Sequence, residues 1–247
     1  MKILIIGDSC IDRFTYGECK RLCPEAPVPV FSPIDTYRNE GMAKNVFNNF
    51  KNLAPDFNVD FISNSNQITK TRFVDIKTNQ MLLRIDDNDQ CPRFADLDKL
   101  EDYDAVLISD YDKGFLNEED IEYLLNKYPL SFIDSKKIFG DWIMKASFIK
   151  INQSEYEKNK ENLTNYEGQL IVTLGEKGVL WSNLIHPPSR QAEVSDLSGA
   201  GDTFFAAFVY HYLKHQSISN SIYFAQNCSL EVIEKKGVVV VENSLAT

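Results

Sequence analysis

Four short aliphatic runs, each ending in polar residues, constrain the fold of this 247-residue chain most strongly. They lie at residues 2–6, 103–108, 130–133 and 148–151. Continuous aliphatic runs are typical of strands that are buried on both faces of a parallel sheet. Helical patterns alternate with these strands over nearly the whole length. The sequence therefore predicts an α/β fold of three αβα layers with a mainly parallel central sheet.

Length and composition limit the number of domains, the classes of partner and the cellular compartment. We expect one domain over residues 1–247, long enough to bury a sizeable core. The formal net charge of −10 argues against nonspecific binding of nucleic acid or of an anionic membrane. There is no apolar run of 18 residues, and the first strand is too short for a signal peptide. Five scattered cysteines without zinc-ribbon spacing predict a reduced, cytoplasmic setting.

A polar turn with two glycines, at residues 196–204 (Asp-Leu-Ser-Gly-Ala-Gly-Asp-Thr-Phe), runs directly into a helical pattern. Gly199 and Gly201 let an anion approach the backbone, and the first turn of a helix offers unpaired N–H groups. Asp202 then places a carboxylate beside the bound anion. This arrangement suits a base that deprotonates a hydroxyl while a phosphoryl group moves. The alternative is an ordinary helix cap.

Polar residues follow the predicted strands where open α/β sheets bind ligands. Asp8 follows the first strand, with Asp12 four residues later, and these two either open a helix or bind sugar hydroxyls. Asp110 and Lys113 follow a later strand and are candidate substrate residues. Neither a dinucleotide fingerprint nor a Walker A sequence occurs, so the chain is not predicted to be a P-loop kinase.

The glycine turn resembles the C-terminal signature of the ribokinase-like (PfkB) carbohydrate kinases. This resemblance implies that Asp202 is the catalytic base and that Gly199, Ala200 and Gly201 form the anion hole for the phosphoryl group of ATP. Relatives have Asp-Pro-Lys where this chain has Asp-Ser-Lys at residues 134–136. Their lysine approaches the transferred phosphate, which implies the same role for Lys136.

A narrower resemblance starts near the N-terminus. Residues 24–30 (Pro-Glu-Ala-Pro-Val-Pro-Val) form an extended edge segment, because three prolines forbid a helix and disfavour a central strand. This run, together with residues 7–8, 11–13 and 16–17, resembles the opening of the D-glycero-β-D-manno-heptose-7-phosphate kinase domain of bacterial ADP-heptose synthesis. The implied substrate is a heptose 7-phosphate used for surface polysaccharide.

The family resemblance also implies a nucleotide site. Asn152 and Glu155 match an Asn-x-x-Glu motif that organises Mg²⁺, largely through water, and they also suit a capping box. Thr173, Gly175 and Gly178 match a Thr-x-Gly-x-x-Gly turn near the nucleotide, although a turn alone explains the glycines. The adenine side is implied to include Ala225 and Asn227.

The remaining motifs of the resemblance imply a small β lid over the sugar, with strands at about residues 14–34 and 67–87. Asn45 matches a sugar-binding asparagine that follows Gly41, although Glu40 and Lys44 depart from the family pattern. Guanidinium groups suit phosphate oxygens. The lid therefore offers Arg72 and Arg84 as candidate substrate-phosphate ligands, with solvated charges as the alternative. Lys70, in the same motif, is a candidate substrate-binding residue. Such a lid pairs with another subunit in several relatives, which implies a homodimer.

Between residues 63 and 69 the chain passes almost directly to the second lid segment, where relatives have a further βαβ segment. We expect a shortened sheet or a trimmed flank. Many bifunctional relatives also contain a nucleotidyltransferase domain. We expect a separate enzyme to supply that reaction step here. The resulting hypothesis is an ATP- and Mg²⁺-dependent sugar kinase. The alternatives are a kinase for another sugar and an inactive sugar- or nucleotide-binding regulator.

Overall fold

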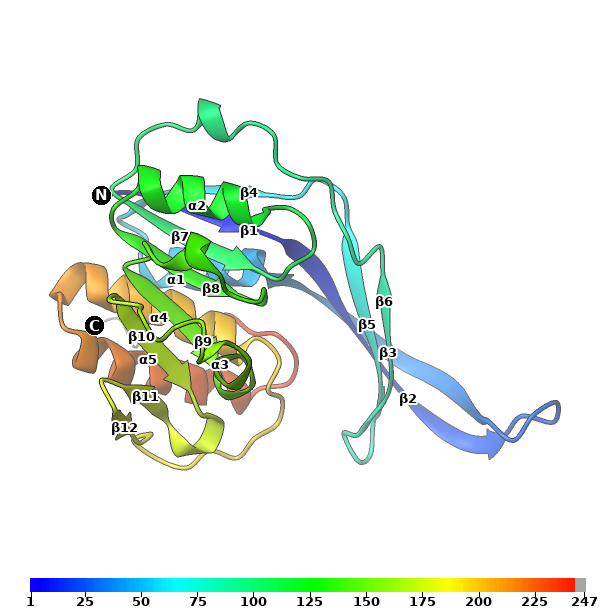
Figure 1. The fold of residues 1–247 in the computed structure, drawn as a ribbon. Helices are drawn as coiled ribbons and strands as arrows, with labels where there is room; N and C mark the ends of the chain where they lie inside the picture. The colour runs from blue at the N-terminus through cyan, green and yellow to red at the C-terminus, as the bar shows by residue number, and fades with distance from the viewer. Residues whose placement is uncertain (243–247) are drawn as a thin grey trace.

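Two β-sheets organise the chain in a computed structural model that describes residues 1–242 (Figure 1). The larger, eight-stranded sheet contains β1 (Lys2–Gly7), β4 (Asn58–Ser63), β7 (Ala105–Asp110), β8 (Ser131–Ser135), β9 (Phe148–Asn152), β10 (Gln169–Thr173), β11 (Val179–Trp181) and β12 (Leu184–His186). The smaller, four-stranded sheet contains β2 (Ser9–Leu22), β3 (Pro29–Met42), β5 (Ile68–Asp75) and β6 (Met81–Asp87). The described α-helices are α1 (Ala43–Leu53), α2 (Glu118–Lys127), α3 (Gln153–Asn159), α4 (Ala200–His215) and α5 (Ile218–Ile233).

The larger sheet has the strand order β12-β11-β10-β9-β8-β7-β1-β4. All neighbours from β4 to β10 are parallel, and β11 and β12 are added antiparallel. The central strands alternate their side chains between two buried faces, which explains their continuous aliphatic sequences. The predicted three-layer α/β architecture with a mainly parallel sheet is confirmed.

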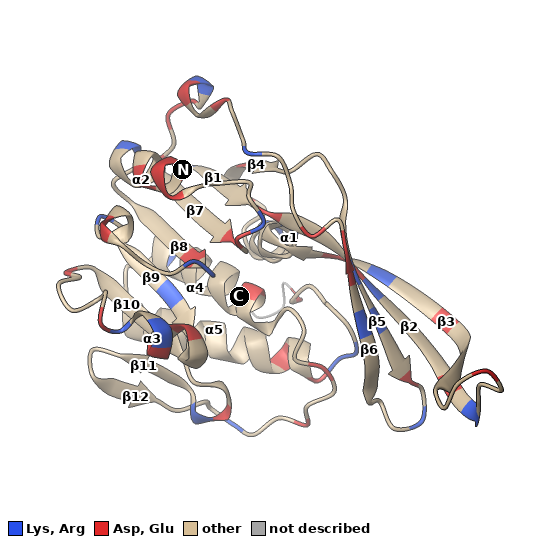
Figure 2. Ribbon diagram, turned by 45° about the vertical axis from the view of Figure 1, so that its right-hand side comes forward, with Lys and Arg blue, Asp and Glu red and all other residues tan. Residues whose placement is uncertain are grey.

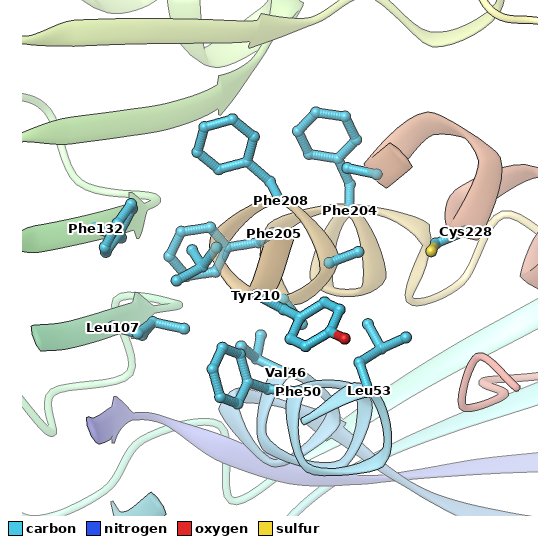
Figure 3. Close-up of a cluster of buried hydrophobic side chains, with 14 of the residues drawn as sticks. Val46, Phe50, Leu53, Leu107, Phe132, Phe204, Phe205, Phe208, Tyr210 and Cys228 are labelled. Atoms are coloured by element: carbon cyan, nitrogen blue, oxygen red, sulfur yellow. The ribbon is translucent and has the colours of Figure 1, made fainter. Parts of the chain in front are cut away.

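Helices cover both faces of this sheet. On one face, α1, α4 and α5 pack against alternate strand residues such as Ile5, Leu107 and Phe132 (Figure 3). Helix α4 is buried almost all round, and its Phe204, Phe205 and Phe208 fill the space between the sheet and the neighbouring helices. The opposite face packs against α2 and the 3-10 turn Asp141–Ile143. The rigid body that results fixes the start of α4 relative to the strand ends.

The chain order places a topological switch beside β1. The chain crosses from β1 to β4 on one side and returns to β7 on the other. Ligands of open α/β sheets bind where neighbouring connections diverge in this way, at the carboxyl ends of the strands. The ends of β1, β7, β8 and β9 carry polar and charged residues at this edge, and acidic and basic segments meet there in Figure 2. A ligand is therefore expected at this edge.

The smaller sheet, here called the lid, extends from the body on long strands in the order β3-β2-β5-β6 (Figure 1). Its first two strands cover Ser9–Leu22 and Pro29–Met42, a wider range than the expected 14–34. The prolines at 24, 27 and 29 lie in the connection or at the first residue of edge strand β3, as their chemistry requires. The alternative that Asp8 and Asp12 open a helix is wrong, because β2 follows β1 directly.

The shortened region lies at the sheet edge. Four residues, 64–67, join β4 to β5, and within residues 1–242 no strand lies beyond β4. The residues of β4 are partly buried or exposed, unlike those of its neighbour β1. No helix of the described chain has the length and hydropathy needed to cross a membrane.

Candidate active site

The glycine turn leads into α4 as predicted. Gly199 is the residue before the helix and has a φ of 81°, a left-handed conformation that favours glycine. A Cβ at Gly199 would lie 2.8 Å from the Asn45 amide nitrogen, so there is no room for a side chain. The Asp196 carboxylate fastens the turn by accepting from the Ser198 and Gly237 N–H groups at 2.8 and 3.2 Å. No described side chain caps α4, so the N–H groups of Gly201 and Asp202 can meet an anion, and that of Ala200 can do so by leaving its 3.3 Å contact with the Leu197 carbonyl oxygen.

Asp202 lies in the first turn of α4 and is 4% exposed. Its Oδ1 accepts a 2.6 Å hydrogen bond from the Tyr111 hydroxyl, and its Oδ2 accepts from Asn45 Nδ2 at 3.1 Å. Burial raises the pKa of Asp202 to about 6, although both hydrogen bonds oppose the increase. A carboxylate of this pKa is ionised at neutral pH and is a stronger base than an ordinary aspartate.

Two lysines converge on a buried carboxylate beside the glycine turn. Asp134 at the end of β8 contacts Lys136 Nζ at 3.0 Å and Lys150 Nζ at 2.5 Å. Burial alone would raise the pKa of Asp134, but the two ammonium groups outweigh it and the pKa is lowered. Lys136 also contacts Glu155 Oε1 at 2.7 Å. These four residues form a charged cluster that reaches from β8 to the start of α3.

Asn152 and Glu155 form a complete capping box on α3. Asn152 Oδ1 accepts from the Glu155 N–H at 2.9 Å, and Glu155 Oε2 accepts from the Asn152 N–H at 2.8 Å. The capping-box alternative is therefore confirmed. The described residues contain no group of three or more His, Cys, Asp or Glu arranged for a metal ion. One carboxylate and one amide suit a Mg²⁺ ion that keeps most of its water and is held mainly by phosphates.

Asp8 and Asp110 are predicted substrate-binding residues, and both carboxylates accept hydrogen bonds from the loop that carries Tyr111. Asp8 accepts from the backbone N–H groups of Tyr111 at 2.7 Å and Phe115 at 3.3 Å. Asp110 accepts from Ser135 Oγ and from Lys137 Nζ, at 2.5 and 3.0 Å. Burial raises the pKa of Asp110, although Lys137 opposes the increase. Lys113 lies outside this cluster, and its Nζ pairs with Asp89 Oδ2 at 2.5 Å.

The inner face of the lid carries a row of charges. Asp12, Lys70 and Asp86 lie in register across β2, β5 and β6, and Phe14, Arg72 and Arg84 form the next row. Asp12 pairs with Arg72, and Arg84 forms two 2.7 Å hydrogen bonds with Asp86. A Cβ at Gly41 would overlap the Asp12 carboxylate, which explains the glycine there.

Lys70 differs from the other lid cations. It is 6% exposed, and its ammonium group contacts the Met42 sulfur at 3.0 Å and lies 5.2 Å from the centre of the Tyr111 ring. Among the described residues it forms no ion pair with a carboxylate. Lys136 Nζ is also 5.2 Å from the centre of the same ring. Tyr111 thus links the lid to Asp202 and to the Asp134 cluster.

The predicted nucleotide residues lie farther along the sheet. Gly175 and Gly178 form a tight turn between β10 and β11, with φ angles of 61° and 100°, and Thr173 precedes it. Asn227 contacts Ser189 of the loop after β12. Ala225 is fully buried in the core instead. Next to it, a hollow of about 330 Å³ separates the loop from α5, lined by His186, Pro187, Pro188, Ser189, Ser219, Tyr223 and Gln226.

The structure thus joins Asp202, Asn45 and Gly199 with Lys136, Asn152 and Glu155 through shared contacts. Sequence reasoning missed roles for Tyr111, Asp134 and Lys150. Lys150 had a visible signal, because it is a charged residue inside an otherwise apolar strand. Tyr111 had none, since its partner Asp202 is 91 residues away.

A buried carboxylate beside a glycine turn at an uncapped helix N-terminus, at the strand ends of an α/β sheet, is an arrangement suited to phosphoryl transfer. The sequence model described as "pfkB family carbohydrate kinase" matches residues 58–243. The chain belongs to this family and is a sugar kinase.

Curated relatives agree with this assignment. "Bifunctional protein HldE" of Helicobacter pylori is 31% identical over 293 aligned positions, which cover 96% of this chain and 63% of the relative. The protein of the same name from a Nitratiruptor species is 28% identical, with coverages of 96% and 62%. The chain therefore spans less than two thirds of these relatives. The alignment has more positions than the chain has residues, so the relatives contain segments that it lacks.

The fold matches that of ribokinases. A Thermotoga maritima ribokinase superposes with a TM-score of 0.77 at 15% identity, covering 99% of this chain and 97% of that one. An Arabidopsis thaliana ribokinase complexed with ribose and ATP gives a TM-score of 0.72 at 14% identity, with the same coverages.

Proposed function

We propose that this chain transfers the γ-phosphoryl group of ATP to the anomeric hydroxyl of a heptose 7-phosphate. The observation that carries the transfer is the position of Asp202, buried at the open N-terminus of α4 directly after the glycine turn. The identity to HldE proteins over 96% of the chain supports the sugar class, together with the proline-rich run at residues 24–30.

In this mechanism the sugar hydroxyl approaches Asp202 and displaces the Tyr111 hydroxyl. Asp202 takes the proton while the sugar oxygen forms its bond to phosphorus and the bond to the leaving ADP breaks. The N–H groups of Ala200, Gly201 and Asp202 stabilise charge on the phosphoryl oxygens, and Lys136 adds a positive charge. Asn152 and Glu155 are the residues that would hold water-coordinated Mg²⁺, which neutralises phosphate charge when bound.

The lid cations support a phosphorylated sugar over a neutral one. The buried ammonium group of Lys70 contacts a thioether and an aromatic ring, and the carboxylates that flank it in register, Asp12 and Asp86, are each paired with an arginine instead. Burying a cation without a carboxylate is costly, so an anionic ligand is the natural partner. Arg72 and Arg84 lie in register one row farther out. In the proposed pose the anomeric end of the sugar meets Asp202, and its phosphate lies at the lid cations, of which Lys70 approaches Tyr111, the partner of Asp202.

An assay of the purified chain with ATP, Mg²⁺ and a panel of sugars tests the proposal. We expect ADP release with heptose 7-phosphate, and phosphorus NMR should place the new phosphate on the anomeric oxygen. Faster turnover of another sugar or sugar phosphate would support the kinase activity but assign that compound as the substrate instead. ATP binding without turnover of any sugar would favour the inactive regulator instead.

We also propose that the lid forms a homodimer. Large apolar side chains are exposed on its strands and connections, which is typical of a protein interface: Leu22, Val28, Ile34, Tyr37, Ile76, Met81, Leu82, Leu83 and Ile85. Light scattering should give twice the mass of one chain, and the double substitution of Leu83 and Ile85 by Lys should give a monomer. A wild-type monomer at micromolar concentration would contradict the interface.

A further inference from the structure

Lys150 is a charged residue in the middle of a buried strand. It lies in β9, between β8 and β10 of the parallel sheet, and is 3% exposed. Its neighbours along the strand, Ile149 and Ile151, are fully buried. Burying an ammonium group in such a place is costly even when it is paired, because an apolar residue of similar size would be cheaper. The position therefore calls for a reason beyond folding.

The geometry supplies one, because the ammonium group of Lys150 lies directly beneath the glycine turn. A Cβ built on Gly201 would be 3.2 Å from Lys150 Nζ. Gly201 itself is exposed, so an anion bound against its backbone lies next to this charge. Lys150 also acts to lower the pKa of Asp202, the residue that follows Gly201 in the chain. No other lysine is found this close to the turn glycines among the described residues.

Asp134 holds this cation in place together with Lys136. Its Oδ2 contacts Lys150 Nζ at 2.5 Å and its Oδ1 contacts Lys136 Nζ at 3.0 Å. One buried carboxylate thus orients the ammonium group of Lys150 in β9 and that of Lys136, which follows β8. Lys136 is also paired with Glu155, whereas Lys150 pairs with Asp134 alone among the described residues, so Lys150 is the cation of this cluster that suits a ligand with negative oxygens at the turn.

We propose that Lys150 is a second catalytic cation, which contacts an oxygen of the γ-phosphoryl group at the glycine turn. Asp134 is the positioning residue for Lys150 and Lys136. The proton of the sugar hydroxyl goes to Asp202. The contribution of Lys150 is charge stabilisation as the bond from phosphorus to ADP breaks and the bond to the sugar oxygen forms. This inference rests on the proposed phosphoryl transfer and adds a group to it.

The test compares Lys150→Met and Lys150→Arg with the wild-type chain. Removing one preorganised charge from such a site typically lowers kcat by about 100-fold or more. We expect Lys150→Met to lose that much kcat with little change in the KM for the sugar, and Lys150→Arg to recover part of it. Arg93→Met is the matched control, because it removes a cation from the buried Asp120 away from the site. It should leave kcat unchanged.

A binding measurement separates this inference from the proposed function. If Lys150 contacts the γ-phosphoryl group, Lys150→Met should reduce the preference of the chain for ATP over ADP, measured by calorimetry without sugar. Should that variant fail to fold, Lys150→Gln is judged by the same two measurements. A full kcat with an unchanged ATP-to-ADP preference would overturn the role of Lys150. If the wild type turns over no sugar, the proposed function fails and the nucleotide preference alone decides.

Discussion

The hydroxyl of Tyr111 donates a 2.6 Å hydrogen bond to Oδ1 of Asp202, so the proposed base is covered by an aromatic side chain before substrate binds. The other oxygen of Asp202 is already engaged by Asn45. A sugar hydroxyl therefore reaches the carboxylate by replacing the Tyr111 hydroxyl. The backbone N–H of Tyr111 donates a hydrogen bond to the Asp8 carboxylate, which fixes the position of Tyr111. The loop that carries Tyr111 thus connects substrate entry with the state of the base.

Replacing Tyr111 by Phe removes a hydrogen bond that lowers the pKa of Asp202. We expect the pKa of Asp202 to rise, so that the acid limb of the kcat/KM profile moves to higher pH. A pH profile from about pH 5 to 9 would show the shift as a change in the midpoint of that limb. An acid limb at the wild-type position would show that the hydrogen bond does not tune the base.

The wild-type profile is itself predicted. Burial raises the pKa of Asp202 to about 6, and Tyr111, Asn45, Asp134 and Lys150 are the groups that act on it. The base is active when ionised, so kcat/KM should be level above this pKa and fall below it. Turnover that stays constant down to about pH 4, where an ordinary aspartate begins to protonate, would be inconsistent with this environment.

The same shift predicts a stability effect. Because the folded-state pKa of Asp202 is raised from 3.8 to about 6, the ionised carboxylate destabilises the fold, and this cost grows as pH rises through that window. Asp202→Asn should therefore be more stable than the wild type at about pH 8, by up to roughly 3 kcal/mol. Denaturant unfolding at that pH and near pH 4 measures it. The difference should be smaller at the lower pH, and an equal difference at both would exclude the titration as its cause.

Lys70 provides a test of the substrate phosphate. Lys70→Met should raise the KM for the phosphorylated sugar by at least about 10-fold, because a charge-assisted contact is lost, and leave the KM for ATP unchanged. Arg38→Met is the control, since Arg38 lies in register with Arg13 on the other side of the lid from Asp12 and Lys70. An equal KM increase in both variants would assign the effect to lid stability instead.

Gly41 provides a steric test of the lid. In Gly41→Ala the new Cβ would overlap the carboxylate of Asp12, which must then move away from Arg72. We expect a sugar KM that is raised by about 10-fold or more, at an unchanged ATP KM, because the loss falls on the lid side of the cleft. Steady-state kinetics with each substrate varied in turn measures the sugar KM and the ATP KM separately. Wild-type values for both would show that Asp12 does not contribute to sugar binding.

The sequence predicted the parts of this site that depend on local pattern. Aliphatic runs placed Asp8 and Asp110 at strand ends, and spacing alone suggested that Asn152 and Glu155 cap a helix. The capping box forms between residues three apart, so its geometry is contained in the local sequence.

What sequence could not predict depends on contacts across the fold. The carboxylate of Asp8 is occupied by backbone N–H groups more than 100 residues away, and Tyr111 meets Asp202 across 91 residues. Lys44 departs from the family pattern, but its ammonium group lies over the Phe47 and Phe61 rings. The first lid segment, expected at 14–34, was placed too narrowly because its many polar residues hide the period-2 pattern that marks a half-buried strand, whereas the second, expected at 67–87, contains β5 and β6.

Phosphoryl transfer by Asp202→Asn tests the central claim most directly. The purified variant and the wild type are compared with ATP, Mg²⁺ and heptose 7-phosphate, and ATP binding is measured by calorimetry in parallel. We predict that the variant keeps its fold and binds ATP like the wild type, but transfers no measurable phosphate. Transfer at the wild-type rate would contradict the assignment of Asp202 as the base and the account built on it.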